Sequence, residues 1–371
     1  MIIFLLFFLS IYGSLNFYFF FKAKSILHFS GKSEWMAVMI LIVLILAPII
    51  IRILESFHME TVARFAAYCG YLWMAFVFLF FFTHMTLDVL RYVLRFLCPD
   101  GSDVPMRNLF FCLAVFMSLV LVAYGFLDAQ QIRVKKLEIH TGKLTSNVER
   151  LRIVQLSDVH IGLMIRGKRL KNILEKVKKE NPDILISTGD LLDGELDNIT
   201  LEAEQFTEIK PKYGKYAILG NHEYYAGIEK SLEFTKQAGF EILRDESKKV
   251  AGITIIGLDD PTGRKHGFTK EDSRLPNLFP KAQREEFVVL LKHQPTIRKD
   301  KNFNLQLSGH THGGQIFPFS YVTRLFFPKV YGYHQLDNGQ SVYISKGAGT
   351  WGPPVRVLAS PEITVIDLIK Q

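Results

Sequence analysis

Cysteine is scarce in this sequence and absent from most of it. Only three of the 371 residues are cysteines, and all of them precede residue 130: Cys69, Cys98 and Cys112. The rest of the chain therefore offers neither a disulfide nor a thiolate ligand. A metal site in that part has to be built from nitrogen and oxygen donors.

Charged residues are missing from four long stretches within the first 130 residues. Each stretch is close to the roughly 20 apolar residues that cross the hydrocarbon core of a bilayer. The sequence therefore predicts an all-α membrane unit over residues 1–130 with four transmembrane helices. Their predicted spans are about 2–21, 35–54, 66–87 and 108–128.

Two other interpretations of these stretches are a cleaved signal peptide and a very apolar helical bundle. A signal peptide needs positive charge ahead of its apolar core, whereas this chain runs from Met1 to Phe21 without any charged side chain. A signal peptide would also leave the other apolar stretches unexplained. We therefore expect a multi-pass protein of a cell membrane, with the lipid bilayer as a partner.

The sequence does not determine on which side of the membrane the second half lies. Four spans place both ends of the chain on one side, and the cytoplasmic side usually carries the excess of Lys and Arg. Here the basic residues next to the spans divide six to six between the two sides. The oligomeric state is equally open.

A concentrated basic region is also lacking. The formal net charge is +8, yet no block of Lys and Arg stands out and no motif for RNA or DNA binding is present. Proteins that bind nucleic acid typically carry a basic face. We therefore expect no nucleic acid partner.

The sequence changes character after residue 130. Residues 131–149 are mixed and polar and are predicted to be a linker, although Val134, Leu137 and Ile139 indicate an edge strand within it. Over residues 150–371, short apolar runs typical of buried strands alternate first with helical patterns and later with loops. This order predicts a layered α/β domain in which two sheets pack together and helices lie outside.

Polar residues follow five of these predicted strands. The five turns contain Asp158 and His160; Gly189 and Asp190; Gly220, Asn221, His222 and Glu223; Lys292 and His293; and Gly309, His310, Thr311 and His312. Ligands of α/β folds collect at the carboxyl ends of strands, so we expect these turns to converge at one edge. Any one of them is also explained as an ordinary turn. Together they predict a single site.

The candidate donors in these turns are of one chemical kind. Asp, Asn and His without thiolate suit Mn, Fe or Zn. Seven donor residues, counted without His222, are too many for one tetrahedral ion. They are about right for two ions that share one carboxylate. The sequence thus predicts two divalent cations per chain.

The turns DVH, GD, GNHE, KHQP and GHTH resemble, in this order, the motifs of the calcineurin-like metallophosphoesterases. The resemblance covers about residues 150–371 and leaves out the four predicted spans. The GHTHGGQ ending is similar to a membrane-associated bacterial branch that includes UDP-2,3-diacylglucosamine hydrolases and cell-wall phosphodiesterases. The resemblance implies a two-sheet metallophosphoesterase sandwich and a metal-dependent hydrolase that acts on phosphoric ester bonds.

The resemblance also implies roles for single residues. One metal would be held by Asp158, His160, Asp190 and His312, and the other by Asp190, Asn221, His293 and His310, with Asp190 as the bridge. His222 would protonate the leaving alkoxide. Arg356 lies in a Gly- and Pro-rich loop that resembles one bordering the family's site, and it would hold a phosphate oxygen. A plain turn with a surface arginine explains Arg356 equally well.

The leading hypothesis is a membrane-anchored phosphoesterase that hydrolyses phosphodiester, pyrophosphate or phosphomonoester bonds. Anchoring near a bilayer favours a lipid or envelope precursor as its substrate, although it is compatible with a soluble one. One alternative is a metal-binding sensor or binding module without turnover, against which the complete ligand set and His222 argue. Another is a transporter or channel regulated by the second half. The predicted spans contain almost no ionisable residues, which argues against an ion or proton pathway through them.

Overall fold

The computed structural model divides into two compact units. It describes residues 2–97, 103–145, 147–194, 199–265, 267–268, 278, 286–297, 303–336 and 339–371. The first unit consists of Met1–Leu127 with Gly352–Val355, and the second of Asp128–Trp351 with Arg356–Gln371. We describe each unit by itself.

The first unit consists of four long apolar helices. They are α1 (Ile2–Leu27), α2 (Lys32–Ser56), α3 (Glu60–Leu97) and α4 (Asp103–Asp128). All four are long and apolar enough to cross a membrane. Large side chains such as Trp35, Phe65 and Phe116 are exposed on their outer faces, which suits contact with lipid. The four predicted spans are therefore confirmed as candidate membrane helices.

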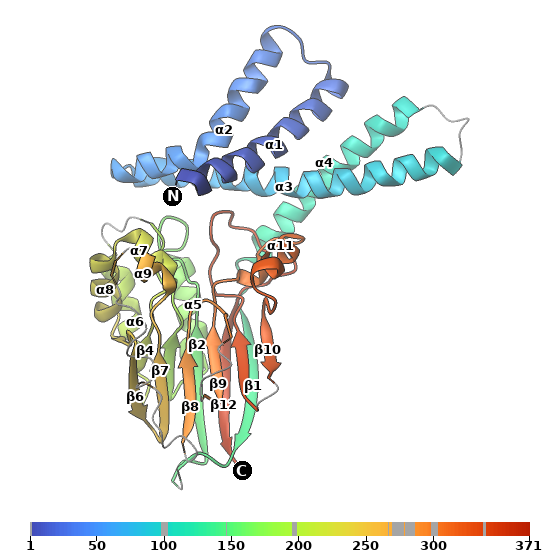
Figure 1. The fold of residues 1–371 in the computed structure, drawn as a ribbon. Coiled ribbons are helices and arrows are strands. Elements are labelled where there is room, and N and C mark those ends of the chain that lie inside the picture. The colour runs from blue at the N-terminus through green and yellow to red at the C-terminus, as the bar shows by residue number, and fades with distance from the viewer. Residues whose placement is uncertain are drawn as a thin grey trace. The chain divides into compact units, whose positions relative to one another are not determined.

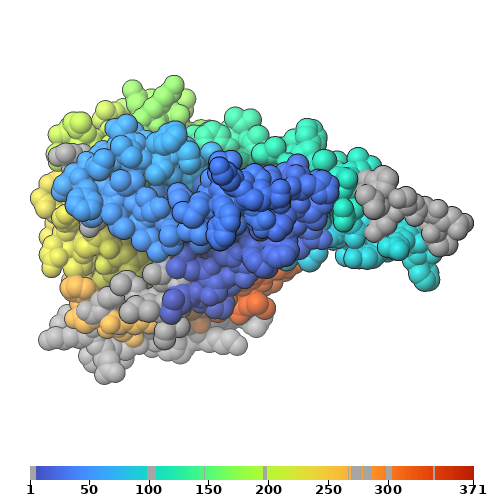
Figure 2. Space-filling model, turned by 90° about the horizontal axis from the view of Figure 1, so that it is seen from above, coloured from blue at the N-terminus to red at the C-terminus, as the bar shows by residue number. Residues whose placement is uncertain are grey.

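Small side chains and polar contacts join these helices. Both α1 and α2 pack against α3 (Figure 1; blue in Figure 2). Gly70 of α3 lies against Ala47 of α2, where any larger side chain would collide. Between α1 and α3, Trp73 Nε1 donates to Asn16 Oδ1 at 2.7 Å. Small residues and interhelical hydrogen bonds are the usual means by which apolar helices associate.

Helix α3 is longer than the predicted span 66–87. Its 38 residues correspond to about 57 Å at 1.5 Å per residue, well beyond a hydrocarbon core of about 30 Å. The additional turns carry charged residues, including Glu60 at one end and Arg95 at the other. The predicted span ends where charged residues begin. Charged residues do not end a helix, so α3 continues beyond the span on both sides.

The second unit contains two six-stranded sheets (Figure 1). In the first sheet the order is β1 (Arg133–Thr141), β12 (Glu362–Lys370), β2 (Arg150–Leu156), β3 (Ile184–Ser187), β4 (Lys215–Ala217) and β5 (Glu241–Ile242). In the second sheet the order is β10 (Gly332–Gln335), β11 (Ser341–Ile344), β9 (Leu305–Ser308), β8 (Phe287–Leu291), β7 (Ile253–Gly257) and β6 (Glu246–Val250). Strand β12 is antiparallel to β2, while β2, β3, β4 and β5 are parallel to one another. In the second sheet β7, β8 and β9 are parallel and β6 is antiparallel to β7, so both sheets are mixed.

Alternating side chains of the buried strands create the layers. Ile153 of β2 points into the core between the two sheets, where it joins Ile255 and Leu307. Its neighbour Val154 points to the opposite face and joins Leu170 and other helical residues. Successive side chains of a strand alternate between faces, so one apolar run serves two cores. The predicted layered α/β domain is confirmed.

Helices are placed on the faces and at the ends of these sheets. The helices are α5 (Gly167–Lys179), α6 (Thr200–Thr207), α7 (Asn221–Ala226), α8 (Ile228–Gln237), α9 (Pro261–Lys265), the short 3-10 helix η1 (His312–Gly314) and α11 (Phe319–Phe326). Apolar residues of α5, α6 and α8 cover the outer face of the first sheet. The sequence did not predict α7, α9 or α11, which are short and lie in loops after strands.

The predicted linker 131–149 contains an additional strand of the domain. Strand β1 pairs in parallel with β12, with Arg133 opposite Glu362 and Thr141 opposite Lys370. The linker prediction is therefore wrong for residues 133–141, whereas the edge strand indicated there is present. The error has a physical cause, because β1 lies at an edge of the sheet with five of its nine residues exposed and has only a weak apolar pattern.

A buried carboxylate fixes β12 against β2. Asp367 accepts hydrogen bonds from Arg152 Nε at 2.8 Å and Arg152 Nη2 at 3.1 Å, and it also pairs with Arg150. Its side chain is buried. Burial alone would raise the pKa of Asp367, but the two arginines lower it to about 2. The ionised form is therefore strongly preferred in the folded domain.

We predict that Asp367→Asn lowers the free energy of unfolding by about 2 kcal/mol at neutral pH, because charge-assisted hydrogen bonds to a buried acceptor are lost. The stabilisation by the carboxylate should be complete above about pH 4 and disappear as the pH falls towards about 2. Denaturant unfolding of the full-length chain at several pH values measures both effects. The control Glu208→Gln removes an exposed pair with Lys178 and should change stability by less than about 0.5 kcal/mol. Equal losses in the two variants would contradict this account.

Candidate metal centre and active site

The five polar turns converge at one edge of the two sheets. Asp158 N donates to Gly189 O at 3.0 Å and His160 N to Asp190 O at 3.1 Å, which joins the turns after β2 and β3. Gly309 N donates to His293 O at 3.0 Å, which joins the turns after β8 and β9. The convergence expected from strand ends in α/β folds is present.

The backbone of these turns is unusual for residues with side chains. Asp158, His160, Asp190, His310 and His312 all have positive φ, between 50° and 71°. Left-handed conformations of non-glycine residues are uncommon and cluster at functional sites. The surrounding packing holds them there. A Cβ on Gly220 would collide with Asp190, and one on Gly309 would collide with Asp158 and Ser157. Glycine is thus required where two turns touch.

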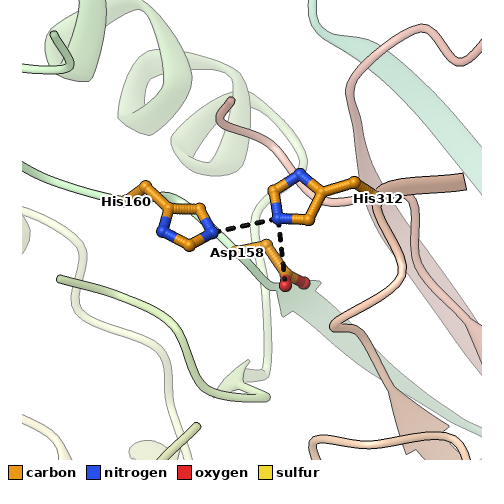
Figure 3. Close-up of side chains that lie close together, drawn as sticks. All are labelled: Asp158, His160 and His312. Atoms are coloured by element: carbon orange, nitrogen blue, oxygen red, sulfur yellow. Dashed lines mark hydrogen bonds and ion pairs between the residues drawn. The ribbon is translucent and has the colours of Figure 1, made fainter. Parts of the chain in front are cut away.

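Asp158, His160 and His312 form one group of donors (Figure 3). His160 Nε2 and His312 Nε2 are 2.9 Å apart. His312 Nε2 lies 3.5 Å from Asp158 Oδ1. All three side chains are buried. Their donor atoms point at one small volume (Figure 3).

Asp190, Asn221, His293 and His310 form a second group next to the first. His293 Nε2 lies 3.1 Å from Asp190 Oδ2 and 3.2 Å from Asn221 Oδ1. His310 Nδ1 lies 2.9 Å from the same Asn221 oxygen and 3.2 Å from His293 Nε2. Asp190 Oδ2 is also 3.8 Å from His160 Nε2 of the first group. One carboxylate therefore faces both groups.

The donor chemistry of both groups fits divalent cations. A cation requires imidazoles in the neutral form and carboxylates in the ionised form. Burial lowers the pKa of His160 to about 4 and that of His310 to about 3, so both rings are neutral at physiological pH. Burial alone would raise the pKa of Asp190, but the positive charges of His293 and His222 hold it well below its usual range. Asp190 in turn raises the pKa of His293, so a cation bound there would have to displace the proton of that ring. These residues are clustered for metal binding.

His222 lies beside the donor groups and is fixed by a carboxylate. Its Nδ1 is 3.0 Å from Asp193 Oδ1, and its backbone N–H donates to Asp190 Oδ1 at 2.9 Å. Burial alone would lower the pKa of His222, but Asp190 and Asp193 raise it to about 9. The rings of Tyr225 and Trp351, both exposed, flank the imidazole at 5.5 Å and 5.8 Å between centroids.

The role of Asp193 beside His222 is not predicted by the sequence motifs. Asp193 follows Asp190 by three residues in the same loop, but nothing in that spacing indicates that it meets a histidine almost 30 residues later. The sequence feature that could have indicated this role is the second aspartate in GDLLD. A second carboxylate in a turn that already carries a candidate ligand is a candidate for orienting a neighbouring imidazole.

Glu223 was named in its motif without a role, and the structure gives it one. Its carboxylate accepts hydrogen bonds from the backbone N–H groups of four residues: Asp190 at 3.0 Å, Leu191 at 2.7 Å, Leu192 at 3.1 Å and Gly220 at 2.6 Å. Glu223 is buried at the start of α7. It thereby fixes the loop that carries Asp190 to the turn that carries Asn221.

Arg356 does not lie where a phosphate oxygen would meet it. The side chain is fully buried, and burial lowers its pKa to about 10. It donates to the backbone oxygens of His312, Gly349 and Ala359. Its Nη2 also lies 3.0 Å from His312 Nδ1. The geometry contradicts both a direct phosphate contact and a surface arginine, because the donors of the guanidinium are directed at the loop and the ring of His312.

We predict that Glu223→Gln weakens metal binding, because an amide offers one acceptor oxygen instead of two and directs an N–H₂ group at backbone donors. Leaving buried N–H groups unpaired costs about 1–3 kcal/mol each, so the Asp190 loop should loosen. Metal content after dialysis of the full-length chain, measured by mass spectrometry, tests this. Glu229→Gln, an exposed position in the first turn of α8, is the matched control. Equal metal retention by both variants would show that the loop does not depend on Glu223.

Comparison with known proteins agrees with this geometry. The model of the calcineurin-like phosphoesterase family matches residues 151–314. An uncharacterized metallophosphoesterase of Aquifex aeolicus is 39% identical over 261 residues, which make up 68% of this chain and 98% of that protein. An uncharacterized metallophosphoesterase of Campylobacter jejuni is 30% identical over 295 residues, or 78% of each chain.

A vertebrate relative combines the same kind of domain with a membrane part. A transmembrane protein with metallophosphoesterase domain from Danio rerio is 32% identical over 270 residues, which cover 69% of this chain and 62% of that protein. The matched motifs, the two mixed sheets and the clustered Asp and His side chains support one conclusion. This chain belongs to the calcineurin-like metallophosphoesterases.

Proposed function

We propose that the protein is a multi-pass, membrane-anchored phosphoesterase that hydrolyses phosphodiester, pyrophosphate or phosphomonoester bonds with two divalent cations. The observation that carries this proposal is the position of Asp190, whose carboxylate faces both donor groups. Two cations that share a carboxylate are a common arrangement in phosphatases and nucleases. Mn, Fe or Zn suits the nitrogen and oxygen donors.

The proposed ligand assignment follows the two donor groups. One cation is held by Asp158, His160, Asp190 and His312, and the other by Asp190, Asn221, His293 and His310. When bound, such cations acidify a water molecule and neutralise the oxygens of a phosphate ester. The protein contributes the spacing of the two cations, because each ligand sits in a turn that is hydrogen-bonded to another ligand's turn.

His222 is the proposed general acid. Asp193 occupies the Nδ1 side of the ring, which leaves Nε2 to deliver a proton to the departing alkoxide. The carboxylate of Asp193 at Nδ1 favours the protonated ring, so the proton is present before the ester bond breaks. Asp193 therefore acts as a positioning residue for the acid.

The membrane helices favour a substrate at the bilayer. A site anchored to a membrane meets phosphate esters of lipids or envelope precursors at high local concentration. We therefore propose a lipid-linked phosphate ester as the first substrate class to test. The side of the membrane on which the site lies determines which lipids it can reach.

We predict metal-dependent hydrolysis of bis-p-nitrophenyl phosphate or p-nitrophenyl phosphate by the full-length chain. The protein should be stripped of metal and resupplied with Mn, Fe, Zn or Mg, and turnover should return only with metal. The full chain is needed, since a cut after residue 141 would remove β1 from the sheet. A folded, metal-loaded chain that hydrolyses neither these esters nor a lipid-linked phosphate ester would favour a metal-binding sensor instead.

We predict different defects for two variants of the site. His222→Ala should retain both metals and lose about 10²–10⁴-fold in turnover, because general acid catalysis is worth that much. Asp190→Asn should lose metal as well as turnover, because it weakens the shared ligand. Metal content and kcat, measured on the same samples, separate the two effects. Wild-type turnover in His222→Ala would refute the acid role.

A further inference from the structure

Helix α11 carries large apolar side chains that are exposed. None of its eight residues is buried. Leu325 is 81% exposed and Phe326 74% exposed, and Phe319, Tyr321 and Val322 are exposed as well. Soluble proteins rarely expose a continuous apolar patch of this kind unless something covers it. We call this surface, with the neighbouring exposed Phe317 and Leu358, the α11 patch.

The segment that carries α11 has formal charges of one sign. Residues 312–335 contain no Asp or Glu, whereas Arg324 and Lys329 lie within the segment. Arg324 is exposed on α11 itself. Apolar side chains together with basic ones are typical of helices that lie in the interface of an anionic bilayer.

The α11 patch is continuous with the candidate active site. The turn that carries His310 and His312 leads directly into it, and Gly314 packs against Ser320 of α11. The rings of Phe327 and His310 are 5.2 Å apart between centroids. Helix α11 therefore lies at the same edge of the sheets as the turns that carry the metal-ligand candidates (Figure 1).

The chain also enters the domain at this edge. Strand β1 begins at Arg133 opposite Glu362 of β12, and the neighbouring Thr364 pairs with Gln155 near the end of β2, which leads to Asp158. The start of β1 is thus at the site-bearing edge. Residues 129–132 alone join α4 to β1. Arg169 holds this junction through Ala129 O at 3.3 Å and reaches Thr350 of the loop next to His222 at 3.2 Å.

We propose that the α11 patch is a membrane-docking surface whose partner is the interface of an anionic phospholipid bilayer. The apolar side chains insert among the acyl chains next to the headgroups, and Arg324 and Lys329 bind lipid phosphates. A bilayer suits a patch that combines apolar and basic side chains. A candidate membrane helix, α4, is also joined to the same edge of the domain by only four residues, which keeps this edge close to the membrane. This inference concerns binding only and does not depend on the proposed hydrolysis.

The test uses the unmodified full-length chain in nanodiscs of phosphatidylcholine and phosphatidylglycerol that contain a phospholipid with a diazirine in its acyl chain. Irradiation attaches the lipid to side chains in contact with it, and mass spectrometry of peptides maps the adducts. We expect adducts on residues 317–327 as well as on α1–α4, which serve as the internal positive control. Peptides of β6, with the exposed Ser247, are the negative control. If α1–α4 are labelled and residues 317–327 carry no adducts, the proposal is overturned. The same result is expected if a second copy of the chain covers the patch.

A charge variant tests the electrostatic part. Arg324→Glu should reduce adducts on residues 317–327 by about fivefold or more in nanodiscs with phosphatidylglycerol, because each basic residue near an anionic surface contributes about 1 kcal/mol. Adducts on α1–α4 should not change. The conservative variant Arg324→Lys should behave like the wild type. An unchanged yield in Arg324→Glu would contradict docking to anionic lipid.

Discussion

The buried carboxylate of Asp190 is the feature on which the rest of the site depends. Its two oxygens face His293, His160 and the backbone of His222. A carboxylate without access to water persists as an anion only where donors or positive charge compensate it. Its left-handed backbone is held in place by the hydrogen bonds of Glu223. A displacement of Asp190 would therefore disturb both donor groups and the candidate acid together.

The candidate metal ligands of the second unit all lie at one edge of the two sheets. The parallel strands bring their carboxyl ends there, and the turns that follow supply every candidate ligand. The chain enters from α4 at the same edge, and α11 lies beside the last of these turns. The proposed docking of the α11 patch would bring this edge to the surface of a bilayer.

The layered fold and the composition of the site could be predicted from the sequence because their signals are local. An apolar run followed by Asp158 or His293 marks a strand end without knowledge of its neighbours. The role of Asp193 could not be found in this way, since it depends on how the loop after β3 meets α7. Arg356 was misjudged because arginines are usually at the surface, whereas here backbone oxygens of the loop accept its hydrogen bonds. The sequence alone does not show that residues 133–141 belong to the sheet, because their partner strand β12 lies more than 200 residues away.

The most direct test of the central claim is electron paramagnetic resonance of the full-length chain loaded with Mn²⁺. The account predicts that two Mn²⁺ ions bind per chain and share the carboxylate of Asp190, so their spins should be exchange-coupled and give a multiline spectrum. Independent six-line signals at two ions per chain, or saturation at a single ion, would contradict a centre bridged by Asp190.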